Sequence, residues 1–304
     1  MAKWTAQDMP DQTGRRAIVT GANSGLGFHV SLELARRGAH VVLACRDPSR
    51  GQAALDRLRA QEPGADAELR ELDLASLASV RAFADGVEEP VDLLINNAGV
   101  MAGPQRRTAD GFELQLGTNH LGHFALTGLL LDRLLAAPAP RVVTVSSGAH
   151  RIGRIDFDDL QSERRYNRWA AYGQSKLANL LFMGELARRA AETELVSVAA
   201  HPGYAATNLQ TTGHKLDDLV MKVSNLVIAQ SDAMGALPLL FAATEDLAGG
   251  AFVGPDGVGE QRGHPKLVGM SGRARDAGTA ERLWEVSERL TGVAYDLPAR
   301  MAAT

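Results

Sequence analysis

The chain has 304 residues, of which 45% are hydrophobic and 22% are charged, as in an ordinary globular protein with a sizeable core. The formal net charge of −4 argues against nucleic-acid binding, which requires a concentrated basic face. Residues 1–14 are polar, and the longest apolar stretch, at 126–137, is interrupted by charges and too short to span a bilayer. The single cysteine cannot form an internal disulfide. We therefore expect a cytoplasmic protein without membrane contact.

Short β-branched runs alternate with longer segments of helical periodicity along the chain. We expect strands at 17–20, 40–44, 68–72, 91–95, 141–146 and 195–200. We expect helices at 30–37, 53–60, 77–87, 108–136 and 170–191. Unbroken apolar strands separated by helices are typical of a parallel sheet covered on both faces. The sequence therefore predicts one doubly wound α/β (Rossmann) domain over residues 15–304, after an N-terminal extension at 1–14.

Two stretches interrupt this rhythm, one at 148–169 and one at 208–230. Loops of this length at the carboxyl ends of strands usually carry function. We expect 208–230 to form a flap over the substrate. For His150, Phe157 and Trp169 in the first stretch, substrate contact and simple packing of the insertion both stay open, and packing is favoured.

A glycine-rich turn follows the first expected strand. Residues 20–27 read TGANSGLG and lead into the first expected helix. Glycines at such a turn permit close approach of the backbone to a pyrophosphate, and the helix N-terminus offers free N–H groups to the phosphates. A glycine cluster alone also fits a plain turn, but its place between a strand and a helix favours dinucleotide binding.

The end of the second expected strand indicates which dinucleotide is bound. An acidic residue there would bond the ribose 2′-hydroxyl of NAD, whereas an arginine accommodates the 2′-phosphate of NADP. The chain reads Cys45-Arg46-Asp47 at this point. We therefore expect NADP to be preferred through Arg46. The alternative is NAD, with Asp47 as the ribose partner and Arg46 solvated. Cys45 is interpreted as a packing residue and not as a nucleophile.

Tyr172 and Lys176 are four residues apart in the expected helix 170–191, so both side chains can point into one cleft. The ordinary tyrosine pKa of about 10 is too high for a proton shuttle at neutral pH. An ammonium ~4 Å from the phenol, at an effective dielectric of ~20, supplies about 4 kcal/mol, enough to lower that pKa by roughly two to three units. A tyrosine and a lysine four residues apart occur by chance in many helices, so this pairing needs support from other residues.

Two further elements supply that support. Ser146 and Ser147 end the fifth expected strand, where open α/β sheets bind their ligands. Asn119 lies in the expected helix 108–136. A hydroxyl and an amide are suited to holding a carbonyl oxygen and a relay water.

Together these motifs resemble the short-chain dehydrogenase/reductase family. The matching elements follow the family's order: TGANSGLG at 20–27, Asp73-Leu74, NNAG at 96–99, Asn119, SS at 146–147, YGQSK at 172–176, and Pro202-Gly203 with Thr207. They cover most of the chain and are jointly highly specific. Within the family the chain is most similar to the retinol dehydrogenase-like branch, through HLGHF at 120–124, DLQSERRY at 159–166, SKLANLLF at 175–182 and GPDGVGEQRGHPK at 254–266.

The resemblance implies a role for each matched position. Tyr172 would be the general acid/base, Lys176 would lower its pKa and bond the nicotinamide ribose, and Ser147 would hold the substrate oxygen. Asn119 would support a relay water, and Ser146 would be structural. The implied cofactor contacts are Gly21, Ser24, Gly25, Leu26, Gly27, Arg46, Asp73, Leu74, Asn97, Ala98, Gly99, Tyr172, Lys176, Pro202, Gly203, Ala205 and Thr207, with Tyr204 at the substrate wall.

The resemblance thus implies an oxidoreductase that moves a hydride between NADP(H) or NAD(H) and a small carbonyl/alcohol substrate, without a metal. A non-catalytic dinucleotide-binding sensor or scaffold on the same fold stays open, as does a different chemistry such as epimerisation or reductive dehalogenation. His120 and His123 are interpreted as packing or surface residues. The expected helices 108–136 and 170–191 are candidates for pairing across a two-fold axis in a homo-oligomer.

Overall fold

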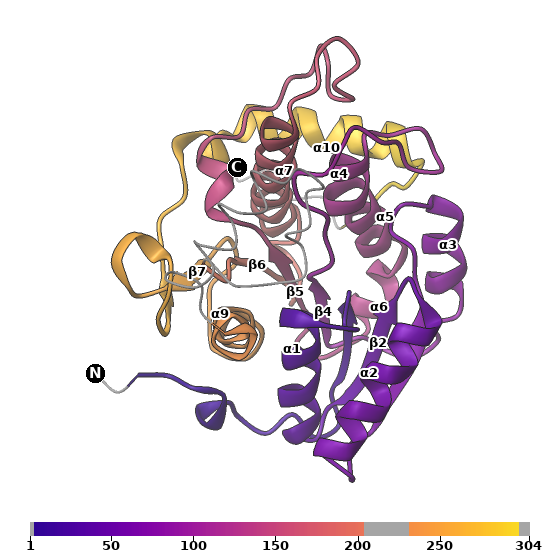
Figure 1. Ribbon diagram of the computed structural model, residues 1–304, viewed down its shortest axis with the longest axis vertical. Coiled ribbons are helices and arrows are strands. Elements are labelled where there is room, and N and C mark those ends of the chain that lie inside the picture. The colour runs from indigo at the N-terminus through magenta and orange to yellow at the C-terminus, as the bar shows by residue number, and fades with distance from the viewer. Residues whose placement is uncertain (1–2, 204–230, 298–304) are drawn as a thin grey trace.

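The computed structural model describes residues 3–203 and 231–297, and in this part of the chain eight strands form one sheet in the order β3-β2-β1-β4-β5-β6-β7-β8 (Figure 1). The neighbours from β3 to β7 run parallel, and β8 pairs antiparallel with β7. The strands are β1 (Arg16–Thr20), β2 (His40–Cys45), β3 (Ala67–Glu71), β4 (Leu93–Asn96), β5 (Arg141–Val145), β6 (Val196–Ala200), β7 (Phe252–Pro255) and β8 (Pro265–Leu267). The predicted doubly wound α/β fold is confirmed.

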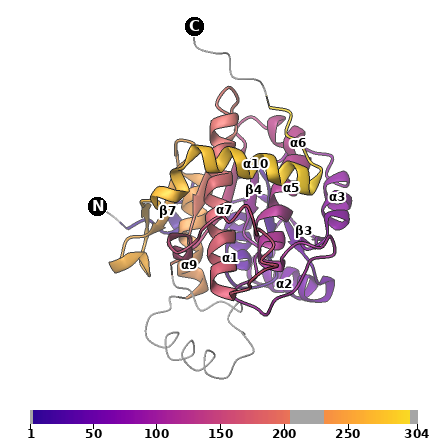
Figure 2. The same ribbon diagram turned by 90° about the horizontal axis from the view of Figure 1, so that it is seen from above.

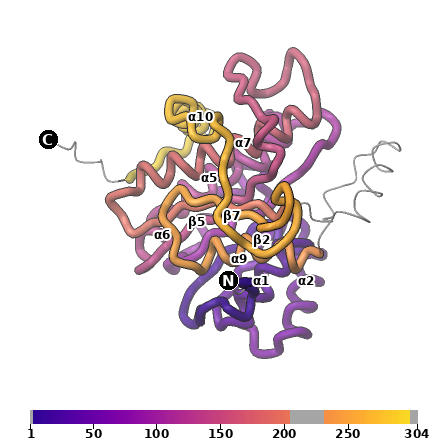
Figure 3. Tube along the Cα trace, turned by 90° about the vertical axis from the view of Figure 1, so that its left-hand side faces the viewer, coloured from indigo at the N-terminus to yellow at the C-terminus, as the bar shows by residue number. Residues whose placement is uncertain are grey.

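Helices cover both faces of this sheet (Figures 1 and 3). They are α1 (Gly25–Arg36), α2 (Pro48–Gln61), α3 (Leu77–Asp85), α4 (Leu114–Leu116), α5 (Gly122–Leu129), α6 (Leu131–Leu135), α7 (Arg168–Arg189), α9 (Asp232–Thr244) and α10 (Ala277–Thr291). Helices α1, α2 and α9 lie on one face, and α3, α5 and α7 lie on the other. Helix α10 crosses the outside of α7 and α5 (Figure 2).

The alternation of side chains along the strands divides the core between the two faces. Ala17 and Val19 of β1 join the apolar cluster under α1, α2 and α9. Ile18, between them, joins the cluster under α3, α5 and α10. Each is fully buried, because successive residues of a strand point to opposite faces and both faces are covered. This explains why the strands are unbroken apolar runs.

Side-chain caps fix where the helices around the sheet edge begin. The Asp47 carboxylate accepts the Arg50 N–H at 3.0 Å, and Pro48 occupies the first turn of α2. The Asn167 amide oxygen accepts the N–H groups of Trp169 and Ala170, both at 3.0 Å, at the start of α7. Such caps satisfy helix N–H groups that have no partner within the helix.

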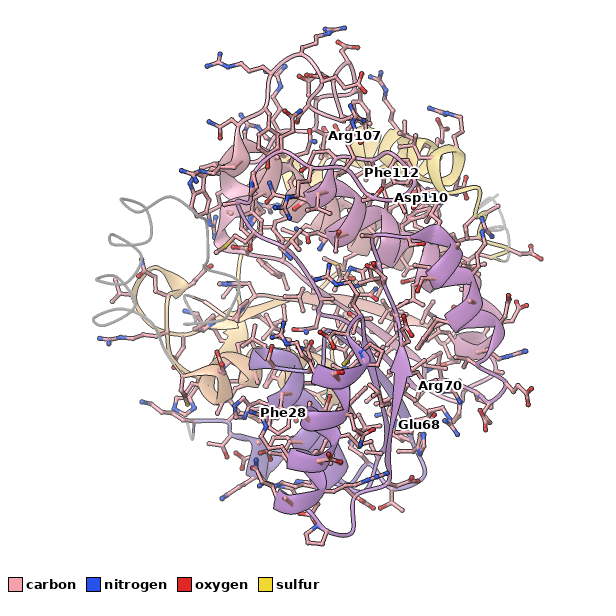
Figure 4. All side chains as sticks on the ribbon, turned by 45° about the vertical axis from the view of Figure 1, so that its right-hand side comes forward. Phe28, Glu68, Arg70, Arg107, Asp110 and Phe112 are labelled. Carbon is pink, nitrogen blue, oxygen red and sulfur yellow. The ribbon has the colours of Figure 1, made fainter. Side chains whose placement is uncertain are left out.

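The predicted helix 108–136 is wrong over its first residues. Thr108 and Phe112 close a turn through a backbone hydrogen bond of 2.9 Å, and Gly111 in this turn has a φ of +86°. Figure 4 shows Arg107, Asp110 and Phe112 in this segment. The left-handed backbone at Gly111 is incompatible with a continuous helix.

The helical path begins instead at α4 and passes through one π-helical turn, η2 (Gly117–Leu121), before α5. Glu113 caps α4, because its carboxylate oxygens accept the N–H groups of Gln115 at 2.9 Å and Leu116 at 2.7 Å. A π-helical turn of this kind often marks a functional site. Asn119 lies within this turn.

The N-terminal residues that the structure describes pack along α9. Trp4 meets Phe241 edge-on, with ring centroids 5.3 Å apart, and its Nε1 donates to the Glu245 carboxylate at 2.9 Å. Met9 is buried in the cluster of that face. The start of the described chain therefore contributes to the packing of one sheet face.

Candidate active site

A cavity of about 560 Å³ opens where the strand order reverses, outside the carboxyl ends of β1, β4 and β5. Open α/β sheets bind ligands in such a crevice. All of the predicted cofactor residues that the structure describes line it: Gly21, Ser24, Gly25, Leu26, Gly27, Arg46, Asp73, Leu74, Asn97, Ala98, Gly99, Tyr172, Lys176, Pro202 and Gly203. Tyr204, Ala205, Thr207 and the predicted flap at 208–230 lie outside the described residues.

The glycine turn at one side of this cavity has no room for side chains. A Cβ on Gly27 would lie 2.5 Å from the Gly21 carbonyl oxygen and 2.6 Å from Asn97 Nδ2. Gly21 itself has a φ of +68°. Ser24, the N-cap of α1, makes no side-chain capping hydrogen bond, and its hydroxyl oxygen accepts a long hydrogen bond of 3.5 Å from Asn23 Nδ2. This cradle of backbone N–H groups fits a pyrophosphate.

Two exposed cationic side chains line the cavity beyond the end of β2. Arg46 follows β2, and Arg50 lies on the first turn of α2; both side chains line the cavity and both are exposed. Asp47 also lines the cavity, but its carboxylate already caps α2. Sequence reasoning missed Arg50, because it started the helix at 53. The Asp47-Pro48 capping signal would have placed Arg50 beside Arg46.

Tyr172 lies at the opposite, buried end of the cavity. Ser147 Oγ accepts the Ala149 N–H at 3.2 Å, and the Ser147 hydroxyl lies close enough to the Tyr172 phenol to act on its pKa. Burial raises the pKa of Tyr172 to about 12, although the Ser147 hydroxyl acts in the opposite direction. The phenol is therefore protonated at neutral pH.

Lys176 is close to Tyr172, but burial raises the pKa of the phenol above its ordinary value, whereas the spacing predicted a lowered pKa. Lys176 Nζ lies 5.8 Å from the centroid of the Tyr172 ring and donates to the Val145 carbonyl oxygen at 3.1 Å. Burial lowers the pKa of Lys176 to about 8. The spacing of four residues put both groups on one helix face, as predicted. The carbonyl at the end of β5, which the spacing cannot reveal, holds the ammonium.

Ser146 and Ser147 have different partners in the structure. Ser146 Oγ donates to the Lys176 carbonyl oxygen at 2.8 Å and ties β5 to α7. Ser147 is the residue that contacts Tyr172.

Asn119 lies behind the cavity wall and is fully buried. Its Oδ1 accepts the Val100 N–H at 2.8 Å, and its Nδ2 donates to the Val100 carbonyl at 2.9 Å and to Ser175 Oγ at 2.9 Å. These bonds use both amide hydrogens. A Cβ on Gly99 would lie 3.0 Å from Asn119 Oδ1 and 3.6 Å from Lys176 Nζ, so the three residues share one small space. Asn119 thus joins the segment at Val100 to helix α7 at Ser175, and both of these parts of the chain line the cavity.

Two residues of the insertion 148–169 line the cavity, Ala149 and Trp169. Trp169 lines the cavity, is 38% exposed, and meets Tyr172 edge-on at 6.3 Å between centroids. This differs from the favoured packing interpretation. His150 and Phe157 do pack. His150 Nδ1 donates to the Ser147 carbonyl at 2.7 Å and its Nε2 accepts the Ser271 N–H at 3.3 Å, while Phe157 lies against Arg282.

Other titratable side chains fall into structural positions. Cys45 is buried, and burial raises the pKa of its thiol to about 11, as expected of a packing residue. Within residues 3–203 and 231–297, no group of three or more His, Cys, Asp or Glu side chains is arranged to hold a metal. No helix in these ranges is long and apolar enough to cross a membrane.

The model of the family described as short chain dehydrogenase matches residues 15–216. The chain belongs to this family. Among curated relatives, human retinol dehydrogenase 12 is 44% identical over 288 residues, which cover 93% of this chain and 88% of that protein. Human retinol dehydrogenase 13 is 44% identical over 289 residues, covering 92% and 85%. This dehydrogenase is an NAD(P)-dependent oxidoreductase that acts on an alcohol or carbonyl group.

Solved structures agree with the family. An uncharacterized protein from Mycobacterium paratuberculosis is 50% identical to the dehydrogenase, with a TM-score of 0.82, and the match covers 97% of this chain and all of that one. A protein from Beutenbergia cavernae, whose crystal structure holds NADP at low occupancy, is 26% identical with a TM-score of 0.61, over 77% of this chain and 91% of that one.

Proposed function

We propose that this dehydrogenase transfers a hydride between NADP(H) and the carbonyl carbon of a small substrate, with Tyr172 as the general acid/base. One observation carries the proposal. The phenol of Tyr172, with the Ser147 hydroxyl beside it, stands at the buried end of the cavity whose other wall is the glycine cradle. The cradle and the exposed arginines would hold the dinucleotide in the same cavity as the phenol.

The preference for NADP over NAD rests on Arg46 and Arg50. Two guanidinium groups at the adenosine end favour a 2′-phosphate, because charge-assisted hydrogen bonds to phosphate are strong. The Asp47 carboxylate, the alternative ribose partner, already accepts a backbone N–H of α2. The Beutenbergia cavernae relative with bound NADP supports the same choice.

In the proposed mechanism, bound NADPH would supply a hydride to the carbonyl carbon in reduction, and bound NADP would take a hydride from the alcohol carbon in oxidation. The Ser147 hydroxyl and the Tyr172 phenol both bond the substrate oxygen and stabilise the negative charge that develops on it. In reduction Tyr172 gives its proton to that oxygen, and in oxidation it takes the proton back. Because the phenol is protonated at neutral pH without ligand, the resting protein is prepared for reduction.

Lys176 and Asn119 take supporting roles in this proposal. The Lys176 ammonium, with a pKa of about 8, is mostly charged at neutral pH and would hold the nicotinamide ribose. Asn119 keeps Val100 and Ser175 in place beside it. A water near the Lys176 ammonium would then pass protons between Tyr172 and the solvent.

The substrate is proposed to be an alcohol or aldehyde with an apolar body. The cavity lining includes the apolar side chains of Trp169, Met101 and Val100, and Trp169 contacts the Tyr172 ring. The curated relatives carry the name retinol dehydrogenase, so retinol and retinal are the first pair to test. The cytoplasmic location and a homo-oligomer stay predictions.

The decisive experiment is a screen of aldehydes, ketones and alcohols with each cofactor, followed by absorbance at 340 nm. We expect turnover with NADPH or NADP and its loss in Tyr172→Phe. A protein that binds NADPH tightly but turns over none of the carbonyl and alcohol classes would instead be the sensor or scaffold.

A further inference from the structure

His123, on α5, is a buried histidine whose two ring nitrogens both have partners. Its side chain is 1% exposed. Nδ1 lies 3.0 Å from the Asn119 carbonyl oxygen, and Nε2 lies 2.9 Å from Thr20 Oγ1. One ring therefore joins the π-helical turn that carries Asn119 to the last residue of β1, immediately before the glycine turn.

The partners determine where the proton of His123 sits. A carbonyl oxygen can only accept, so Nδ1 carries the hydrogen and donates it to Asn119. Burial lowers the pKa of His123 to about 4, with Lys176 nearby acting in the same direction, so the ring is neutral at pH 7. Nε2 is then an acceptor, and the Thr20 hydroxyl is its donor.

The Thr20 hydroxyl carries the connection further. Its oxygen accepts the N–H groups of Asn97 at 3.0 Å and Ala98 at 2.9 Å. These two bonds use both lone pairs of the Thr20 hydroxyl oxygen. The hydroxyl hydrogen can then be donated either to His123 Nε2, at 2.9 Å, or to the Ile95 carbonyl oxygen, at 3.3 Å. The shorter contact favours His123.

We infer that His123 is a positioning residue that fixes the cofactor cradle and the Asn119 segment relative to each other. Its hydrogen bond with Thr20, here called the Thr20 arm, holds the hydroxyl that orients Asn97 and Ala98 in the cavity wall. Its Asn119 arm holds the peptide whose side chain binds Val100 and Ser175. The inference rests on the proposed function, and it replaces the interpretation of His123 as a mere packing residue.

His120 provides a matched control within the same helical segment. It too is 1% exposed, and burial lowers its pKa to about 3. Its Nε2 lies 2.9 Å from Ser287 Oγ on α10, on the side away from the cavity. Replacing His120 tests the cost of losing a buried histidine without touching the cradle.

The two arms can be separated by two substitutions. In His123→Asn the amide nitrogen takes the place of Nδ1. The Asn119 carbonyl therefore keeps its hydrogen-bond donor, whereas the Thr20 hydroxyl loses its acceptor. We expect the NADPH Kd, measured by fluorescence titration, to rise about tenfold, with the single-turnover rate at saturating NADPH within about threefold of native. In His123→Gln the amide oxygen takes the place of Nε2, and the rate should fall about tenfold with the Kd within about threefold. His120→Gln should change neither quantity.

The inference is overturned if all three variants lose the same thermal stability while Kd and rate stay within about twofold of native. It is also overturned if His123→Asn and His123→Gln are indistinguishable in these two readouts. Should the His123 variants not fold, Thr20→Val removes the same bond from the other side. An unchanged NADPH Kd in that variant contradicts the Thr20 arm. The Kd readout needs no substrate, so a native protein that binds NADPH without turnover refutes the proposed function and leaves this test intact.

Discussion

The two ends of the cavity differ in how their charged groups meet solvent. At one end the charged groups, Arg46 and Arg50, are exposed to solvent. At the other end Tyr172 and Lys176 are buried. Burial raises the pKa of Tyr172 and lowers that of Lys176, so that in both residues the neutral form is favoured. Solvated charges interact weakly and are screened by salt, whereas desolvated ones respond strongly to each neighbour. Binding should therefore depend on one end and chemistry on the other.

The largest effect is expected at the buried phenol. Tyr172→Phe removes the proton donor, and general acid–base catalysis of this kind contributes about 10³-fold to a rate. We expect kcat to fall by about that factor in a steady-state assay. Tyr166→Phe is the control, because the Tyr166 hydroxyl donates to the Gly103 carbonyl and does not line the cavity. A Tyr172→Phe variant as active as Tyr166→Phe would contradict the assignment.

Lys176 should make stability depend on pH. Its pKa falls from 10.5 to about 8 on folding, so between these values the unfolded chain binds more protons than the folded one. The free energy of unfolding then rises with pH across this window, by about 3 kcal/mol at most, and below pH 8 the cost of burying the ammonium is fully present. Lys176→Met should lack this rise, and Arg46→Met should keep it. Urea unfolding at pH 7.5 and 10 measures the difference, and equal rises in native and Lys176→Met would refute it.

The glycine cradle should tolerate no methyl group. In Gly27→Ala the new Cβ must displace the Gly21 carbonyl, and such overpacking costs about 2 kcal/mol. We expect lower thermal stability and a weaker NADPH Kd. Gly184→Ala is the matched control in α7, because its Cβ would have no neighbour within 4 Å. That change should stabilise the protein by roughly 0.5–1 kcal/mol. The same sign in both variants would contradict the close approach.

The smallest effects belong to the exposed arginines. Arg46→Ala and Arg50→Ala should each raise the NADPH Kd by about tenfold or less, and the loss should shrink at high salt. The NADH Kd should change little, because NADH lacks the 2′-phosphate. Isothermal titration with both cofactors measures this. Equal losses for NADPH and NADH would mean that the arginines do not discriminate between them.

The sequence predicted those parts of the molecule that local patterns encode. The strands β1 to β6, the glycine turn and the shared face of Tyr172 and Lys176 follow from periodicity and spacing, and the structure confirms these placements. Helix α9 escaped prediction because it is apolar around most of its surface and contains Pro238, so it shows no amphipathic pattern. The short strands β7 and β8 also gave no clear signal.

Long-range contacts explain what the sequence could not supply. The Val145 carbonyl that holds Lys176 lies 31 residues away along the chain, and the partner of His123 at Thr20 lies 103 residues away. The π-helical turn at Asn119 has no sequence signature that we could use. By contrast, Gly111 disfavours a helix, so the sequence itself argued against a helix at 108–113.

The most direct test of the account measures the NADPH Kd and the single-turnover hydride-transfer rate on Tyr172→Phe and Arg46→Ala side by side. The account predicts that Tyr172→Phe keeps the native Kd and loses the rate, and that Arg46→Ala weakens the Kd and keeps the rate at saturation. If Tyr172→Phe transfers hydride at the native rate, or if both variants lose Kd and rate together, the division between a binding end and a chemical end is wrong.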